Sequence, residues 1–297
     1  MKMKNSLLLM VLTAMTLTLA SCSKDDDNDN GNSNDNPNQT ITAPPYKDDA
    51  VKLSLPDNSI NVGGQTANVS ALELAEGGTY IVTYSQVATT RADDGTSYKT
   101  GKYTKSSNSY NLAGFATVTI NGKSGSTYNI VVKTPDGVAT ELNAKAATGS
   151  VATGIMTDNL CRTWTIENTR LTMEVEGITA GRDFPGTCNL NEMIAYAKER
   201  GMKINDDVEE NSVVTGITFT RAGTFLISYM NGSNDVGKWN WTSQNNGTLS
   251  YGWNDSDMGN AFENGTATVA FDGSKCKLTL GADIDGHKVQ AIYTLTF

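Results

Sequence analysis

The chain has 297 residues, of which 23 are lysine or arginine and 32 are aspartate or glutamate, so its formal net charge at pH 7 is −9. A surface of this charge repels phosphate backbones and anionic lipid headgroups, which excludes nucleic acid as a partner. The length allows one large domain or two ordinary ones.

Residues 1–21 have the organisation of a secretory signal. Two lysines precede an apolar stretch, 7–20, which is shorter than the ~20 residues of a transmembrane helix. Leu19-Ala20-Ser21 is a small-residue cleavage site, and Cys22 follows it directly. A thiol at this position can be alkylated by lipid before cleavage. We therefore expect a lipoprotein precursor that is cut after residue 21 and held on a membrane by lipid on Cys22.

Residues 22–46 predict a disordered acidic tether, because no apolar side chain occurs between Cys22 and Ile41. The segment 19–27, LASCSKDDD, resembles the start of surface lipoproteins of the Bacteroidetes. In that family an acidic run after the lipidated cysteine is an export signal. The resemblance implies an outer-membrane lipoprotein that faces the cell surface. Lys24 interrupts the acidic run, and a periplasm-facing position is the alternative.

From residue 47 on, short segments rich in Val, Ile, Thr and Tyr alternate with turns of Gly, Asn and Asp, which is typical of an all-β fold. Asn121-Gly122 and Asp272-Gly273 are expected to form hairpin turns. A single helix is predicted, which Asn189 can cap and Gly201 can end. Its apolar face is formed by Leu190, Met193, Ile194 and Ala197. Clear strands are expected at 79–84, 115–120, 127–132, 224–229, 266–271 and 289–297.

The chain contains an internal repeat, in which residues 69–85 align without a gap on 214–230. Two further blocks follow in the same order, 101–103 with 237–239 and 115–122 with 266–273. The repeat predicts two tandem antiparallel β-meander domains, 47–148 and 155–297. A small-residue stretch near 145–158 is suited to link them.

The second domain opens with an additional strand, 161–166, which carries Trp164. A tryptophan on the first strand, followed by a series of hairpins, resembles the lipocalin or calycin-like barrels of Bacteroidetes lipoproteins. The resemblance covers about 155–297. It implies an up-and-down barrel or half-barrel, with one short helix, that is able to hold a small apolar ligand. A β-sandwich is the alternative fold, since its strands have nearly the same sequence pattern.

The sequence contains no pattern typical of catalysis or metal binding. His287, the only histidine, lies in a turn with no nucleophile motif, and the acidic clusters at 206–210 and 283–285 lie in polar loop sequence. Besides Cys22, the cysteines fit no zinc spacing and allow at most one disulfide. They are Cys161, Cys188 and Cys276. We therefore expect a protein that is not an enzyme and has no cofactor or metal.

One aromatic cluster is the candidate ligand site. Trp239 and Trp241 lie two residues apart and therefore share one face of a strand. If Asn245-Asn246-Gly247 is a three-residue hairpin loop, Trp239 pairs with Trp253, and Trp241 pairs with Tyr251 on the same face. Such rings can stack on the faces of a sugar, or they can fill the core of the barrel.

Two functions therefore stay open. A non-catalytic surface lipoprotein that binds a glycan or a small apolar ligand needs tryptophans that solvent can reach. A structural or adhesive surface lipoprotein, whose protein partners the sequence does not identify, predicts buried tryptophans and an exposed strand edge to which another chain can pair.

Overall fold

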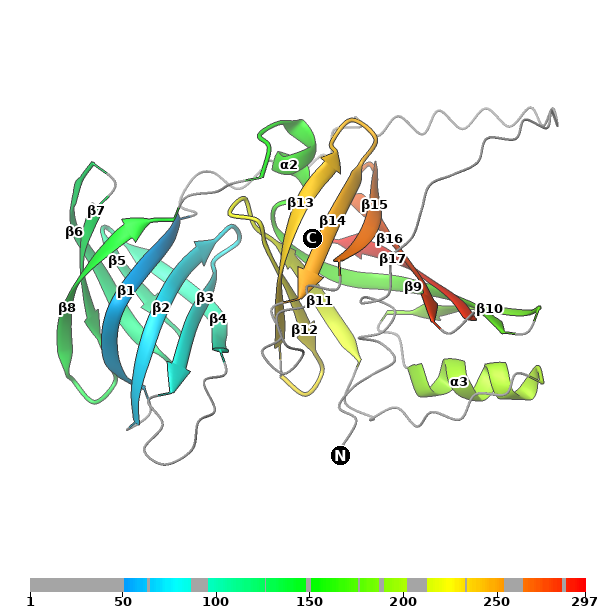
Figure 1. The fold of residues 1–297 in the computed structure, drawn as a ribbon, viewed down its shortest axis with the longest axis horizontal. Coiled ribbons are helices and arrows are strands. Elements are labelled where there is room, and N and C mark those ends of the chain that lie inside the picture. Colours follow the sequence, from blue (N-terminus) through cyan, green and yellow to red (C-terminus); the bar gives the residue numbers. More distant parts are fainter. Residues whose placement is uncertain are drawn as a thin grey trace.

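The computed structural model describes residues 51–62, 65–86, 96–125, 127–147, 151–175, 177–186, 190–201, 213–232, 234–253, 264–284 and 287–297. The signal, Cys22 and the tether lie outside these residues, as do Cys188 and the acidic cluster 206–210. Within them the chain forms two antiparallel β-barrels, which Figure 1 shows with β1–β8 in one and β9–β17 in the other.

The first barrel is a closed ring of the strands β1–β8. Each strand pairs with the next, and β1 pairs with β8 through Leu53–Ala146 and Ser54–Lys145, which closes the ring. Alternate side chains point inward and pack into one apolar core that includes Tyr80 and Ile130. The strands are β1 (Val51–Val62), β2 (Gln65–Ala75), β3 (Thr79–Gln86), β4 (Thr96–Ser106), β5 (Ser109–Leu112), β6 (Ala116–Ser124), β7 (Thr127–Lys133) and β8 (Ala139–Ala146).

The second barrel is closed by its first and last strands, because β17 pairs with β9 from Thr165 to Glu174. The other edge of β9 has two partners. The start of β9 pairs with β11, and the later part of β9 pairs with β10 (Ile178–Pro185), which lies outside the ring. The strands of the ring are β9 (Thr163–Val175), β11 (Val214–Phe219), β12 (Thr224–Tyr229), β13 (Asn234–Ser243), β14 (Thr248–Trp253), β15 (Asn264–Asp272), β16 (Lys275–Ile284) and β17 (His287–Thr296).

The all-β fold of two tandem meanders is confirmed, and both meanders are closed barrels, so the half-barrel and the β-sandwich do not apply. All six expected strands are present. The expected helix is α3 (Leu190–Glu199), followed by Gly201 at φ +88°. The described chain has a second helix that the sequence did not predict, α2 (Ile155–Leu160).

One of the two expected hairpin turns is wrong. Gly273 has φ +58° and joins β15 to β16, as Asp272-Gly273 predicted. At Asn121-Gly122 the strand β6 continues instead, and the pairing register shifts between Ile120 and Gly122. A bulge absorbs the extra residue there, so the turn moves on to Gly125, where φ is +60°.

The internal repeat has the same structure in both barrels. The hairpin β2–β3 corresponds to β11–β12, and each has a register shift at the equivalent residue, Ser70 in one and Thr215 in the other. Each hydroxyl donates a hydrogen bond to a carbonyl of the next strand, to Thr83 and Ser228 respectively. The repeat therefore preserves a local irregularity as well as the strands.

Candidate functional site

The aromatic cluster lies on the hairpin β13–β14, with a register two residues away from the predicted one. Trp239 pairs with Tyr251 and Trp241 pairs with Leu249, while Trp253 faces Gly237. The predicted pairs, Trp239 with Trp253 and Trp241 with Tyr251, are therefore wrong. The loop has four residues, 244–247, and a bulge between Trp241 and Ser243 takes up the difference. Because the shift is even, the rings keep the shared face that the sequence predicted.

That shared face is the inside of the barrel. Trp239 is 3 % exposed and Tyr251 is 5 % exposed, and Trp241 is partly buried against the same core. Only the backbone of Trp253 is described. The ring of Trp239 meets those of Phe219 and Trp241 edge to face, with centroids 5.4 Å apart in both pairs. In this conformation the buried rings offer no surface on which a sugar could stack.

The indole N–H groups of the cluster are used within the protein. Trp239 Nε1 donates to the carbonyl of Thr220 at 3.1 Å, and Trp241 Nε1 donates to Thr157 Oγ1 at 2.8 Å. Burial of an indole normally requires such a partner. Desolvation also raises the pKa of the Tyr251 phenol, which therefore stays neutral. The ligand-binding role of Trp239, Trp241, Tyr251 and Trp253 stays a prediction.

The short helix α2 packs against the core of the second barrel beside this cluster. Met156, Thr157 and Leu160 of α2 are buried, and Leu160 accepts a hydrogen bond from Nε1 of the fully buried Trp164 at 2.9 Å. The guanidinium of Arg162 lies 5.5 Å from the Trp164 ring centroid. The sequence identified Trp164 but not Arg162 or α2, because a six-residue helix has too few turns for a periodic signal.

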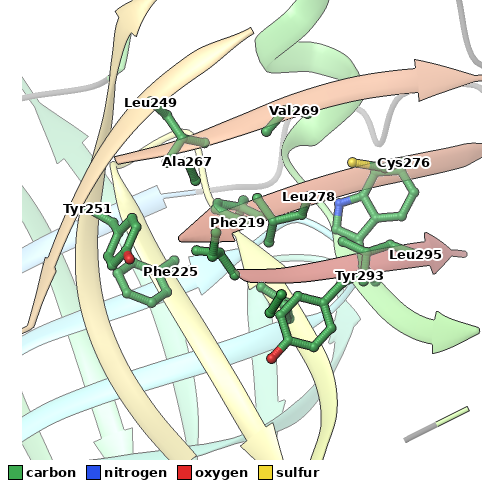
Figure 2. Close-up of a cluster of buried hydrophobic side chains, with 14 of the residues drawn as sticks. Phe219, Phe225, Leu249, Tyr251, Ala267, Val269, Cys276, Leu278, Tyr293 and Leu295 are labelled. Carbon is green, nitrogen blue, oxygen red and sulfur yellow. The ribbon is translucent and has the colours of Figure 1, made fainter. Parts of the chain in front are cut away.

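A small apolar cavity lies inside the second barrel, and Figure 2 labels several of the side chains that line it, among them Phe225 and Tyr251. The volume of the cavity is about 20 Å³, so it holds one water-sized group. The lining residues come from β11, β12 and β14–β17. They are Val214, Ile217, Phe219, Phe225, Ile227, Leu249, Tyr251, Ala267, Leu278, Leu280 and Tyr293. A larger ligand would fit only if some of these side chains moved.

The strand β10 offers an open edge, since β9 is its only partner among the described strands. Gly186 N donates to the carbonyl of Glu167 at 2.7 Å, which continues the β9–β10 ladder by one pair. Antiparallel pairs alternate between exchanging both hydrogen bonds and exchanging none. The backbone groups of Thr179, Gly181 and Asp183 therefore point away from β9. Pro185, which has no N–H, lies in the same alternating set.

Side chains on both faces fix this edge in place. On one face Asp183 accepts from Arg170 of β9 at 2.7 Å. On the other, the guanidinium of Arg182 lies between the rings of Phe184 and Tyr196, at 5.2 and 5.8 Å from their centroids. Tyr196 belongs to α3, which packs beside β10 in Figure 1. The edge strand is thus held by the helix while its outer backbone groups stay unpaired by any described strand.

Comparison with known proteins gives only distant similarity. No family model matches the chain, and no curated protein matches it. A protein assigned to the outer membrane of Bacteroides fragilis is similar over 84 % of this chain and 94 % of its own, with 13 % identity and a TM-score of 0.27. Transferrin Binding Protein B of Haemophilus parasuis, as a double mutant, is similar over 84 % of this chain, with 12 % identity and a TM-score of 0.24.

The chain spans 44 % of that transferrin-binding protein. TM-scores of this size do not establish a common arrangement, so nothing known of either protein is transferred to this one.

The remaining candidates from the sequence have no special geometry in the described residues. Cys161 and Cys276 are buried free thiols, so they do not form the disulfide that the sequence left open, and burial raises the pKa of each. His287 begins β17, and its side chain lies outside the description. Among the described residues, no helix is long and apolar enough to span a membrane, and no group of acidic, histidine or cysteine side chains could hold a metal.

Proposed function

We propose that this chain is a non-catalytic lipoprotein, anchored to the outer membrane through lipid on Cys22 and facing the cell surface, that acts through contacts with another protein. The open edge of β10 is the observation that carries this proposal. The burial of Trp239 and Tyr251 adds support, because a barrel filled by its own aromatic side chains has little room for a ligand.

The edge of β10 suits pairing with an extended segment of the partner. The outward backbone groups of Thr179, Gly181 and Asp183 would bond to that segment as a neighbouring strand does. The β9 ladder and the Arg182 contact to α3 hold β10 in an extended form, which lowers the entropy lost on pairing. The occupant we propose is therefore a strand of another protein, added antiparallel or parallel to β10.

The change Thr179→Pro tests this edge. Proline removes an N–H that points away from β9, so we expect the barrel to lose at most about 0.5 kcal/mol of stability. Pairing with a partner strand should weaken at least tenfold, since a ladder hydrogen bond is lost and the ring obstructs the approach. Residues 47–297 of the wild type, immobilised, should retain proteins from a detergent extract of the outer membrane that the proline variant does not retain.

The control for this experiment is Thr179→Ala, which alters the same side chain and keeps the N–H. It should retain the same proteins as the wild type. Equal retention by the proline variant would contradict the proposal. Sedimentation of each variant alone distinguishes a second copy of this chain from a different partner.

A small apolar ligand inside the second barrel is the second candidate, favoured by the apolar cavity beside Tyr251. Titration of tryptophan fluorescence with alkyl probes and polysaccharides tests it. Ala267→Leu would fill the cavity, whereas Ala270→Leu adds the same group on the exposed face of β15. A saturable change that only Ala267→Leu abolishes would support this function. Absence of any saturable change in the wild type would exclude it, and a polysaccharide response would restore the glycan hypothesis.

A further inference from the structure

The two barrels contact each other through the same hairpin of the repeat. Equivalent residues of β2–β3 and β11–β12 are 145 positions apart, and the equivalent residues Glu76 and Arg221 touch across the contact. Ile81 packs in one apolar cluster with Leu226, which is also its equivalent, and with Val236. The arrangement is an approximate two-fold contact within one chain, like the isologous interface of a dimer. We call this contact the docking seam.

Threonine hydroxyls at equivalent positions of the repeat form hydrogen bonds across the docking seam. Thr224 Oγ1 donates to Glu73 Oε2 at 2.7 Å. The equivalents of these residues are Thr79 and Thr218, and they are joined through Thr163, at 3.3 and 3.0 Å between hydroxyl oxygens. The two halves therefore have matching positions, but the first barrel places a carboxylate where the second has a threonine.

The charges break the symmetry at the centre of the docking seam. Glu76, with a side chain 1 % exposed, lies in the turn between β2 and β3. Its Oε1 is 3.4 Å from the backbone N of Arg221 and 3.9 Å from Arg221 Nη1. Its Oε2 has no hydrogen-bond partner among the described residues. Arg221 lies nearer to Asp158 of α2, at 2.9 Å, so its charge compensates Glu76 only in part.

The other charged or titratable groups around Glu76 do not replace that compensation. Glu73 of β2 adds a like charge, and it is paired with Lys52 of β1 at 3.3 Å. The thiol of Cys161, at the end of α2, is buried, which raises its pKa well above the ordinary value and keeps it neutral. Burial thus dominates at Glu76, and it raises the pKa of this carboxyl from 4.5 to about 7.

We propose that Glu76 is a proton-operated latch between the barrels, which holds the docking seam closed when its carboxyl is protonated and loosens the seam when it is ionised. Separation of the barrels would return the turn of Glu76 to water, where a carboxyl has its ordinary affinity for a proton. Closing the seam is therefore coupled to uptake of a proton, and acidification favours the closed form.

The sign and size of the effect follow from this linkage. The closed form binds the proton more tightly, so closure is most favourable below pH 4.5 and weakens as the pH rises to about 7. The loss approaches tenfold per pH unit within that window and totals roughly 300-fold, with no further change at higher pH.

Labelling of a thiol in the docking seam measures the opening directly. Leu226 is buried against the other barrel, so Leu226→Cys gives a thiol that a maleimide reaches only when the seam opens. The experiment uses residues 47–297, with the unaltered chain as the blank for the native cysteines. Two chains are labelled at each pH, one with Leu226→Cys alone and one with both Leu226→Cys and Glu76→Gln. The labelling rate of the first is divided by that of the second, which cancels the intrinsic reactivity of the thiol.

We expect this ratio to rise from a few-fold at pH 5 to roughly 300-fold at pH 8, because glutamine stays neutral like the protonated acid. The matched control is Glu141→Gln, an exposed acid on β8, whose ratio should stay near one at every pH. A ratio for Glu76→Gln that does not change with pH would overturn the proposal, and so would rapid labelling of Leu226→Cys at pH 5. If Glu76→Gln does not fold, the rate of Leu226→Cys, corrected for thiolate, must itself rise up to pH 7 and then level off.

Discussion

A bare glycine lies beneath an aromatic ring at the same place in both barrels. A Cβ at Gly101 would lie 2.7 Å from Tyr80, and a Cβ at Gly237 would lie 2.3 Å from Phe225 and 2.6 Å from the carbonyl oxygen of Gly252. Each glycine pairs directly with the residue whose ring covers it. The ring takes the space that a side chain would occupy, so these glycines are required by packing and not by backbone angles.

Gly237→Ala should therefore destabilise the second barrel by about 1–3 kcal/mol, because both the ring and a backbone carbonyl would have to move. Unfolding in denaturant, followed by tryptophan fluorescence, measures this barrel alone, since all four tryptophans lie in it. Gly181→Ala, in β10 of the same barrel, is the control, because a Cβ there would make only ordinary contacts, the nearest at 3.4 Å to Thr172 Oγ1, and its effect should stay within about 0.5 kcal/mol. Equal effects of the two changes would contradict this account.

At the scale of single residues, the sequence predicted which aromatic side chains share a face but not where that face points. Trp239 and Trp241 share it because strand side chains alternate. Their partners depended on the loop length and on the bulge near Thr242, which turn residues alone leave undetermined. Polar neighbours such as Asn240 fit an exposed strand as well as a barrel wall, so the inward orientation of Trp239 could not be derived.

Among the elements, α2 is joined to the hairpin β13–β14 through one hydroxyl. Thr157 Oγ1 accepts from Trp241 Nε1 at 2.8 Å and from Gln244 Nε2 at 2.9 Å, and it donates to the carbonyl of Ala152. No side chain caps the start of α2, whose N-cap residue is Gly154. This hydroxyl therefore joins the helix to the hairpin β13–β14, and helix propensity contributes little.

Thr157→Val keeps the shape of the side chain and removes this junction. The N–H groups of Trp241 and Gln244 would lose their acceptor, so we expect a loss of about 1–3 kcal/mol in the unfolding of the second barrel. The same substitution at Thr268, which is exposed on β15, should cost less than about 0.5 kcal/mol. Should both variants unfold at the same denaturant concentration, the junction contributes nothing.

Elements were predicted well where their pattern was long and poorly where it was short or mixed. The strand at 266–271 alternates clearly, the strand at 224–229 is rich in β-formers, and both were found. The strand β10, ITAGRDFP, contains glycine, two charged residues and proline, which together resemble a loop. Those same residues protect an edge strand from unwanted pairing. The composition that prevented the prediction of β10 therefore also suits its place outside the ring.

For the whole molecule, the repeat predicted two meanders, whereas their closure could not be derived. Closure requires β1 to meet β8 and β9 to meet β17, pairings between strands at opposite ends of each barrel, and no local pattern specifies them. The docking seam is likewise a product of distant contacts. Once the repeat is known, however, a contact between equivalent hairpins is the arrangement that internal symmetry favours.

The closure of the first barrel also determines how the molecule would respond to a pull. The chain enters at Val51, on the side of the predicted anchor, and leaves toward the second barrel at Ala147, whose N–H donates to the carbonyl of Lys52 at 2.8 Å. Entry and exit are thus antiparallel neighbours, joined through Leu53–Ala146 and Ser54–Lys145. Tension between the membrane and a partner held by the second barrel would act on adjacent strand ends, so these pairs would break one after another. The ring would therefore peel at β1 and β8 one pair at a time, and so at low force.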